Sequence, residues 1–235
     1  MSNPPKPPAP TANPLAVPTR PAARFTVSRP AAVGERVRQA VVLCRDCSPS
    51  MAGGKDASAS QAVREFVEEL AQPFNKDAFD IAIVDFNDSA HAVHPLSRAS
   101  ALLPVLAPIG AGGSGTDVAS ALTQAEAILQ APMPSEGRNV RPVVILFTDG
   151  NHNQGADPQA AATHLRPLAD VVTVGFGADA DEALLTALAT SPAHFYRCTN
   201  GAQLRTFLVA VAGTLSTTRA KGANATRALG ELKQP

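Results

Sequence analysis

Tryptophan is absent from this chain of 235 residues, tyrosine occurs once, and aromatic residues make up only 4% of the sequence. The core must therefore be filled by valine, leucine, isoleucine and alanine, which suit a buried parallel sheet covered by alanine-rich helices. Because 45% of the residues are hydrophobic, we expect one α/β domain with a full core and residues to spare.

Cysteine is also scarce, and the three cysteines, an odd number, argue against a disulfide framework. A reducing compartment fits this composition best. Apolar runs such as residues 143–147 are far shorter than the roughly 20 residues that cross a bilayer. The opening sequence MSNPPKPPAP has no apolar segment of the secretion-signal type. We therefore expect a cytoplasmic protein with no membrane partner.

The chain has no net charge, but the charges are unevenly placed. Residues 1–45 hold seven Lys/Arg and one acid, and residues 219–235 hold four Lys/Arg and one acid. Residues 46–218 therefore hold nine basic and eighteen acidic side chains. An acidic folded part argues against a nucleic-acid groove. The basic ends are either solvated or lie on an acidic surface, of the domain itself or of a partner.

Composition divides the chain into three parts. Residues 1–30 contain nine prolines and predict a disordered or polyproline II arm, either a linker or a ligand for an aromatic-lined groove. Residues 31–218 are expected to form the folded domain. Residues 219–235 are polar and are expected to form a flexible basic tail.

Apolar periodicity in the folded part alternates between strand and helix patterns. Strands are predicted at residues 39–45, 78–86, 90–96, 141–147, 171–176 and 194–198. Helices are predicted at residues 57–71, 99–106, 117–130, 158–168, 181–189 and 202–214. This alternation implies right-handed βαβ units, and so a doubly wound, mainly parallel α/β sheet with helices on both faces.

Oxygen-bearing side chains gather where these strands are predicted to end, which is the edge at which open parallel sheets bind ligands. Positions i, i+2 and i+4 of an extended segment point the same way, which would aim Asp46, Ser48 and Ser50 at one place. Hydroxyl and carboxylate oxygens without His or thiolate match the preference of Mg²⁺, with Mn²⁺ or Ca²⁺ as alternatives. The candidate metal ligands are Asp46, Ser48, Ser50, Thr116 and Asp149.

These residues resemble the metal-ion-dependent adhesion site of von Willebrand factor A domains. The resemblance covers residues 38–215 and rests on D-x-S-x-S at 46–50, Thr116 after a glycine-rich loop, and T-D-G at 148–150. It implies a Rossmann-like fold in which Ser48, Ser50 and Thr116 hold the metal directly, while Asp46 and Asp149 act mostly through water or a shared hydrogen bond. It further implies a non-catalytic module whose metal takes an Asp or Glu of a partner protein.

Two positions depart from the family's pattern. Pro49 stands where glycine is frequent, which stiffens the loop and removes one N–H. Ser114 is an alternative to Thr116 as the loop ligand. The chain resembles bacterial stand-alone members of the tellurite-resistance type, and other members serve AAA+ ATPases. The partner is therefore open between an AAA+ ATPase and a stress-response signalling protein, and the oligomeric state is not predicted.

Other interpretations of the motifs remain to be weighed against the structure. Residues 110–115 match G-x-G-x-x-G, but a dinucleotide site needs a strand just before them. Cys44 and Cys47 form a C-x-x-C, but three residues apart on an extended chain they should face opposite ways. His152 lies close to the candidate metal edge, either exposed or in contact with a partner.

Two other functions compete with a docking module. A Mg²⁺-dependent hydrolase or phosphotransferase would need an activated nucleophile or a cation that holds phosphate, and Arg45 and Lys55 are the nearby cations. A metal-free scaffold would bind through the proline-rich arm alone.

Overall fold

The computed structural model describes residues 1–2, 37–132 and 137–235, and Glu35–Pro235 form one compact unit. Apart from residues 1–2, the predicted proline-rich arm lies outside the described residues. The strands are β1 (Val37–Asp46), β2 (Phe79–Phe86), β3 (Ala90–Arg98), β4 (Arg138–Asn139), β5 (Val143–Thr148), β6 (Asp170–Phe176) and β7 (Phe195–Cys198). They form a sheet of order β3-β2-β1-β5-β6-β7, with β4 paired to the start of β1. Only β3 is antiparallel to its neighbour among the described strands.

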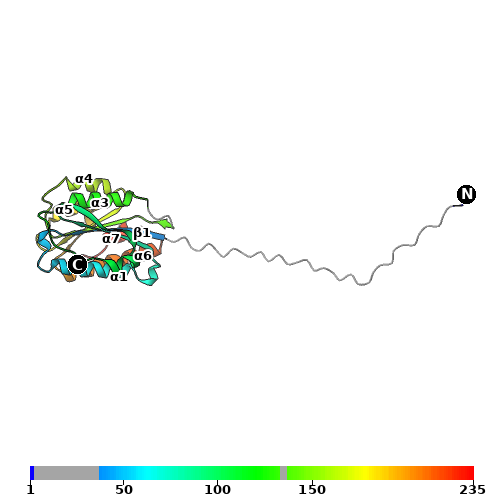
Figure 1. Cartoon of the computed structure of the whole chain (residues 1–235), viewed down its shortest axis with the longest axis horizontal. Coiled ribbons are helices and arrows are strands. Elements are labelled where there is room, and N and C mark those ends of the chain that lie inside the picture. The colour runs from blue at the N-terminus through cyan, green and yellow to red at the C-terminus, as the bar shows by residue number, and fades with distance from the viewer. Residues whose placement is uncertain (3–36, 133–136) are drawn as a thin grey trace. The chain divides into compact units, whose positions relative to one another are not determined.

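Helices cover both faces of this sheet (Figure 1). They are α1 (Lys55–Leu70), α2 (Ala99–Leu102), α3 (Val118–Gln130), α4 (Pro158–Leu165), α5 (Glu182–Leu188), α6 (Gly201–Ala220) and α7 (Thr226–Gly230). Helices α1, α6 and α7 pack on one face, and α3, α4 and α5 pack on the other. The predicted doubly wound, mainly parallel α/β sheet is confirmed.

Strand β1 is central and buried on both faces. Val41 and Leu43 belong to the core under α1 and α6, whereas Val42 and Cys44 belong to the core under α3 and α4. All four side chains are fully buried. A near-continuous apolar run is what a strand covered on both faces requires, which is why this segment could be predicted from sequence.

Polar N-cap residues set the starts of four helices. They are Asp117 for α3, Asp157 for α4, Asp181 for α5 and Asn200 for α6. Each side chain accepts a backbone N–H of the first turn that has no partner within the helix. The cap Asp117 follows Thr116 directly, so the start of α3 also positions a candidate ligand.

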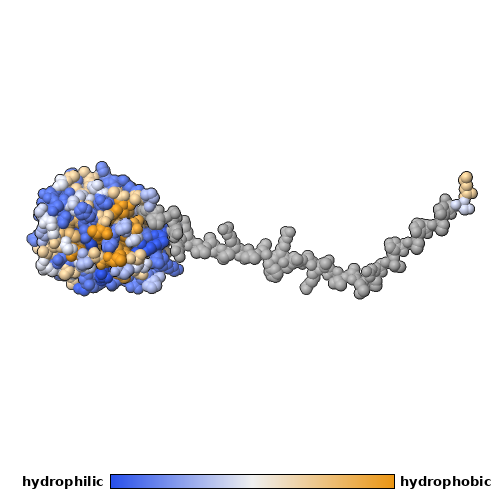
Figure 2. All heavy atoms as spheres, in the orientation of Figure 1, coloured by the Kyte–Doolittle hydropathy of each residue, from blue (hydrophilic) through white to orange (hydrophobic). Residues whose placement is uncertain are grey.

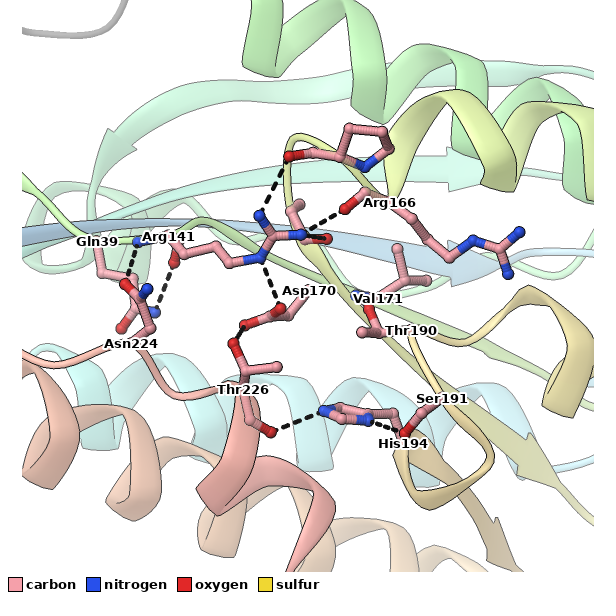
Figure 3. A network of polar contacts seen from close by, with 12 residues as sticks. Gln39, Arg141, Arg166, Asp170, Val171, Thr190, Ser191, His194, Asn224 and Thr226 are labelled. Atoms are coloured by element: carbon pink, nitrogen blue, oxygen red, sulfur yellow. Dashed lines mark hydrogen bonds and ion pairs between the residues drawn. The ribbon is translucent and has the colours of Figure 1, made fainter.

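The segment after residue 218 differs from the flexible tail expected. Helix α6 continues to Ala220, and α7 packs with Leu229 fully buried. The Thr226 hydroxyl donates to Asp170 at 2.6 Å, and Asn224 accepts the Arg141 N–H at 3.0 Å. Figure 3 shows how these side chains lie toward one another. The expectation was wrong because polar composition does not reveal that these side chains find partners at the amino ends of β5 and β6.

The end of the chain also covers the open edge of the sheet at β7. The Gln234 side chain accepts the backbone N–H of Arg197 at 3.1 Å and donates to the carbonyl of Phe195 at 2.9 Å. Unpaired backbone groups on an edge strand favour pairing with other chains. Gln234 satisfies two of these groups in β7.

The surface of the folded unit mixes hydrophilic and hydrophobic residues on the face drawn in Figure 2. The large exposed apolar side chains of this unit lie on separate elements and loops: Phe74, Val93, Val105, Leu168 and Val209. Among the described residues, no helix has the length and apolar character needed to cross a membrane.

Candidate metal centre

Asp46 and Thr148 end two neighbouring parallel strands, β1 and β5, at the carboxyl edge of the sheet. Asp46 is fully buried. One of its carboxylate oxygens accepts the backbone N–H of Ser48 at 2.7 Å, and the other accepts the hydroxyl of Thr148. These two bonds orient the carboxylate and join the loop after β1 to the end of β5.

A chain of polar contacts continues from this loop to Asp149. The hydroxyls of Ser48 and Ser50 lie 2.9 Å apart, and Ser50 donates to Asp149 Oδ1 at 2.6 Å. Asp149 Oδ2 accepts the ammonium of Lys55 at 2.5 Å. The structure thus brings four predicted ligands together, and it adds a lysine that the sequence had suggested only as a phosphate-holding cation.

Thr116 borders the same space from the loop before α3. A Cβ placed on Gly150 would lie 3.5 Å from the Ser50 hydroxyl and 3.7 Å from the Thr116 hydroxyl. Thr116 is buried, its N–H donates to Asn153 Oδ1 at 2.9 Å, and its carbonyl accepts the Asn153 N–H at 3.2 Å. Sequence reasoning missed Asn153, because spacing alone does not say where a loop side chain points.

Ser114, the alternative loop ligand, is bound elsewhere. It is exposed, and both its N–H and its hydroxyl donate to Asp88 Oδ1 at 2.9 Å. These hydrogen bonds lower the pKa of Asp88. Gly113 beside it has φ +83°, and a Cβ there would lie 2.7 Å from Asn87 Nδ2. The geometry therefore favours Thr116 over Ser114 at the candidate centre.

Pro49 fits its position without loss of a hydrogen bond within the turn. It begins the 3₁₀ turn Pro49–Met51, where the first N–H groups have no partner inside the turn. The turn closes through Met51 N–H to the Ser48 carbonyl at 3.0 Å. The fixed φ of proline therefore stiffens the loop that carries both serines.

Burial makes the charged form of Asp46 electrostatically costly. Desolvation raises the pKa of Asp46, against the hydrogen bonds from Ser48 and Thr148, and the nearby charge of Asp149 raises it further. A cation at this place would offset both the desolvation and the repulsion between the carboxylates.

The donor set fits a hard divalent cation. It contains two carboxylates and three hydroxyls, and the described residues hold no group of three or more His, Cys, Asp or Glu side chains suited to a metal. A site here would depend on hydroxyl and carboxylate oxygens, which are ligands that hard divalent cations accept.

Comparison with known proteins places the chain in a family. Residues 40–209, more than half of the chain, match the von Willebrand factor type A domain. The chain belongs to the von Willebrand factor type A (VWA) domain family. VWA domains generally act as metal-dependent modules of protein interaction, and are typically not enzymes. No curated protein sequence matches the chain.

Solved structures share the fold at low sequence identity. The VWA domain is similar to proximal thread matrix protein 1 from the mussel byssus with a zinc-occupied MIDAS motif (TM-score 0.61, 21% identity, 79% of this chain and 48% of that chain). It is similar to the von Willebrand factor type A protein of Catenulispora acidiphila (0.62, 22%, 77% and 43%). It is also similar to BatB of Bacteroides thetaiotaomicron (0.60, 19%, 78% and 99%). The chain thus spans about half the length of the first of these.

The three cysteines of the VWA domain are buried and free. Cys44 and Cys47 lie in the cores on opposite faces of the sheet, so the C-x-x-C pattern does not bring two thiols together. Burial raises the pKa of all three thiols, to about 12 for Cys47 and Cys198.

We expect none of these thiols to react with a disulfide reagent in the native protein at pH 8. The thiolate is the reactive form, and burial both suppresses it and blocks access. Titration should find no reactive thiol before unfolding and three in guanidinium. Rapid reaction of Cys47 in the native state would contradict its burial.

The remaining motif interpretations are also decided by the VWA fold. No strand precedes residues 110–115 directly: the described chain there runs from the 3₁₀ turn Leu103–Val105 through a loop, so the dinucleotide-site interpretation fails. His152 is half-buried, and its Nδ1 accepts the N–H of Val118 at 3.3 Å, so it helps hold the start of α3.

Proposed function

We propose that this VWA domain binds one divalent cation, Mg²⁺ in the first place, and uses it to dock an Asp or Glu of a partner protein. The observation that carries the proposal is the position of the Ser50 hydroxyl. It lies between the Ser48 hydroxyl and the Asp149 carboxylate and faces Thr116 across Gly150. Oxygen donors from three separate loops therefore border one small space.

Hydroxyl and carboxylate side chains would have different roles at this site. The neutral hydroxyls of Ser48, Ser50 and Thr116 would hold the cation, and Asp46 and Asp149 would orient the donors and supply the balancing charge. A cation held mainly by neutral oxygens keeps a high affinity for one more anionic oxygen. A carboxylate from outside the chain is the matching ligand.

A hydrolase or phosphotransferase remains the second candidate, but the two nearby cations do not favour it. The Arg45 guanidinium is buried and bound to Asp85 at 2.6 and 2.8 Å, away from the candidate centre. Lys55 neutralises the buried Asp149 carboxylate, so a phosphate would have to share its ammonium with that carboxylate. A scaffold that binds through the proline-rich arm rests on residues outside the described part of the chain.

We further predict a cytoplasmic location and membership of the bacterial tellurite-resistance type. We predict that the partner is an AAA+ ATPase or a stress-response signalling protein. The acidic character of residues 46–218 gives no support to a nucleic-acid partner.

The proposal is tested by an affinity pull-down with the full chain, read by mass spectrometry. We expect a partner retained in Mg²⁺, released by EDTA, and recovered when excess Mg²⁺ is restored. The same experiment in Mn²⁺ and Ca²⁺ ranks the metals. Equal retention of all captured proteins with and without EDTA would overturn metal-dependent docking.

A further inference from the structure

Lys55 occupies a position that helix electrostatics disfavours. It is the first residue of α1, a helix of 16 residues whose N-cap, Gly54, provides no side-chain hydrogen bond. Helix N-termini carry partial positive charge, so acidic residues are favoured there and lysine is not. Residues that break a local rule of this kind are found at functional sites.

The contacts of Lys55 give a reason for its position. Its ammonium binds Asp149 Oδ2 at 2.5 Å, while Asp149 Oδ1 accepts the Ser50 hydroxyl at 2.6 Å. Asp149 is buried, so Lys55 supplies the neutralising charge for that carboxylate. A Cβ on Gly177, which has φ +103°, would lie 3.7 Å from the ammonium. The lysine thus lies between the candidate centre and the turn after β6.

The ammonium also faces solvent beside the site. The Lys55 side chain is 36% exposed and lines an open cavity of about 340 Å³ together with Ser58, Thr199 and Asn200. Among the residues that the structure describes, no acidic side chain lines this cavity. The predicted metal ligands do not line this cavity, so Lys55 is the residue that connects it with the candidate centre, and its ammonium is accessible to an anion from the cavity side.

Lys55 changes the net charge of the candidate centre. Asp46 and Asp149 contribute two negative charges, and a divalent cation alone would bring the total to zero. With Lys55 the loaded site carries one net positive charge. That charge repels the cation and attracts an anionic ligand.

We propose that Lys55 is a specificity-determining residue: it weakens the hold of the site on the cation and thereby selects a carboxylate, over a neutral group, as the ligand from the partner. This inference rests on the proposed metal-dependent docking. It assigns Lys55 two effects of opposite direction, on the metal and on the anion, and a residue needed only for the fold would not produce that pair.

The test measures Mn²⁺ binding by calorimetry with the full chain. Removing one unit charge a few ångströms from the cation should tighten Mn²⁺ binding about tenfold in Lys55→Met. Lys55→Arg keeps the charge and should stay within about threefold of the unchanged protein. Lys233→Met removes an exposed lysine of the C-terminal end and should leave Mn²⁺ binding unchanged.

Acetate serves as the probe for the anion. At constant ionic strength, replacing chloride by acetate should tighten Mn²⁺ binding several-fold in the unchanged protein, because coupling between two ligands is reciprocal. The gain should be lost in Lys55→Met. Association of Mn²⁺ with acetate is measured without protein and subtracted. Lys55→Gln is measured in parallel, so that the test survives if the methionine variant does not fold.

The outcomes separate the two proposals. The role of Lys55 would be overturned if Lys55→Met and Lys55→Gln bind Mn²⁺ no more tightly than the unchanged protein. It would also be overturned if the acetate effect persists in these variants. Metal-dependent docking would remain in place in either case. Absence of Mn²⁺ and Mg²⁺ binding in the unchanged protein would overturn the proposed function itself.

Discussion

Asp46→Ala is expected to lower the affinity for Mn²⁺ and Mg²⁺ by about a hundredfold and to abolish metal-dependent partner binding. The substitution removes one of two negative charges at the centre. It also removes the carboxylate that accepts the Ser48 N–H and the Thr148 hydroxyl. These two hydrogen bonds join the loop after β1 to the end of β5. Calorimetry measures the metal affinity, and the pull-down in Mg²⁺ measures the loss of the partner.

Asp179→Ala is the matched control. Asp179 is an exposed aspartate in the loop after β6. Its substitution removes one negative charge from the same edge of the sheet and leaves the predicted ligands unchanged. We expect this variant to keep its metal affinity within about twofold, because exposed charges are strongly screened. Equal losses in both variants would indicate a diffuse charge effect and contradict a built site. Circular dichroism should show the folded state for both.

Asp170→Ala is expected to lower the free energy of unfolding by about 3 kcal/mol. Asp170 is fully buried at the amino end of β6 and accepts Arg141 Nε at 2.7 Å and the Thr226 hydroxyl at 2.6 Å (Figure 3). Removing it leaves the half-buried Arg141 guanidinium without its counter-ion and releases the segment that carries α7. Urea unfolding followed by circular dichroism measures the change.

Two further variants divide this loss into its parts. Thr226→Val removes only the hydroxyl that donates to Asp170 and should cost about 1 kcal/mol. Glu231→Ala breaks an exposed pair with Arg227 on the same helical segment and should cost less than about 0.5 kcal/mol. Because Asp170 lies at the opposite edge of the sheet from Asp46, folded Asp170→Ala should retain its Mn²⁺ affinity. A loss of metal binding in the folded variant would contradict that separation.

The predicted elements agree with the structure where a local pattern had a strong physical cause. The buried runs at the centres of β1, β5 and β6 are mostly apolar, because both faces of the sheet are covered. The same search for apolar patterns did not find the helical segment after residue 218. Leu229 and Ala225 are too few to form a periodic pattern, and their burial depends on Tyr196 and on the core under α6.

The candidate centre divides in the same way. Spacing was enough to place Asp46, Ser48 and Ser50 at the end of β1. The extended segment expected there was wrong beyond Ser48, because Pro49–Met51 form a 3₁₀ turn, and this turn brings the Ser50 hydroxyl to 2.9 Å from that of Ser48. Spacing was also enough to place Asp149 at the same edge, because parallel strands end together. Spacing could not choose between Ser114 and Thr116, since a residue in an irregular loop has no preset direction.

The sequence by itself determined the α/β alternation, the edge that carries the oxygen donors and the separation of the two cysteines of C-x-x-C, because each follows from a period of the backbone. Only the tertiary structure decided that Asp88 accepts the hydroxyl of Ser114, that Lys55 neutralises Asp149 and that Asp170 accepts the hydroxyl of Thr226 in the C-terminal segment. Those pairings join residues between 26 and 94 positions apart. They depend on the distances that packing creates and on the cost of leaving a buried charge without a partner.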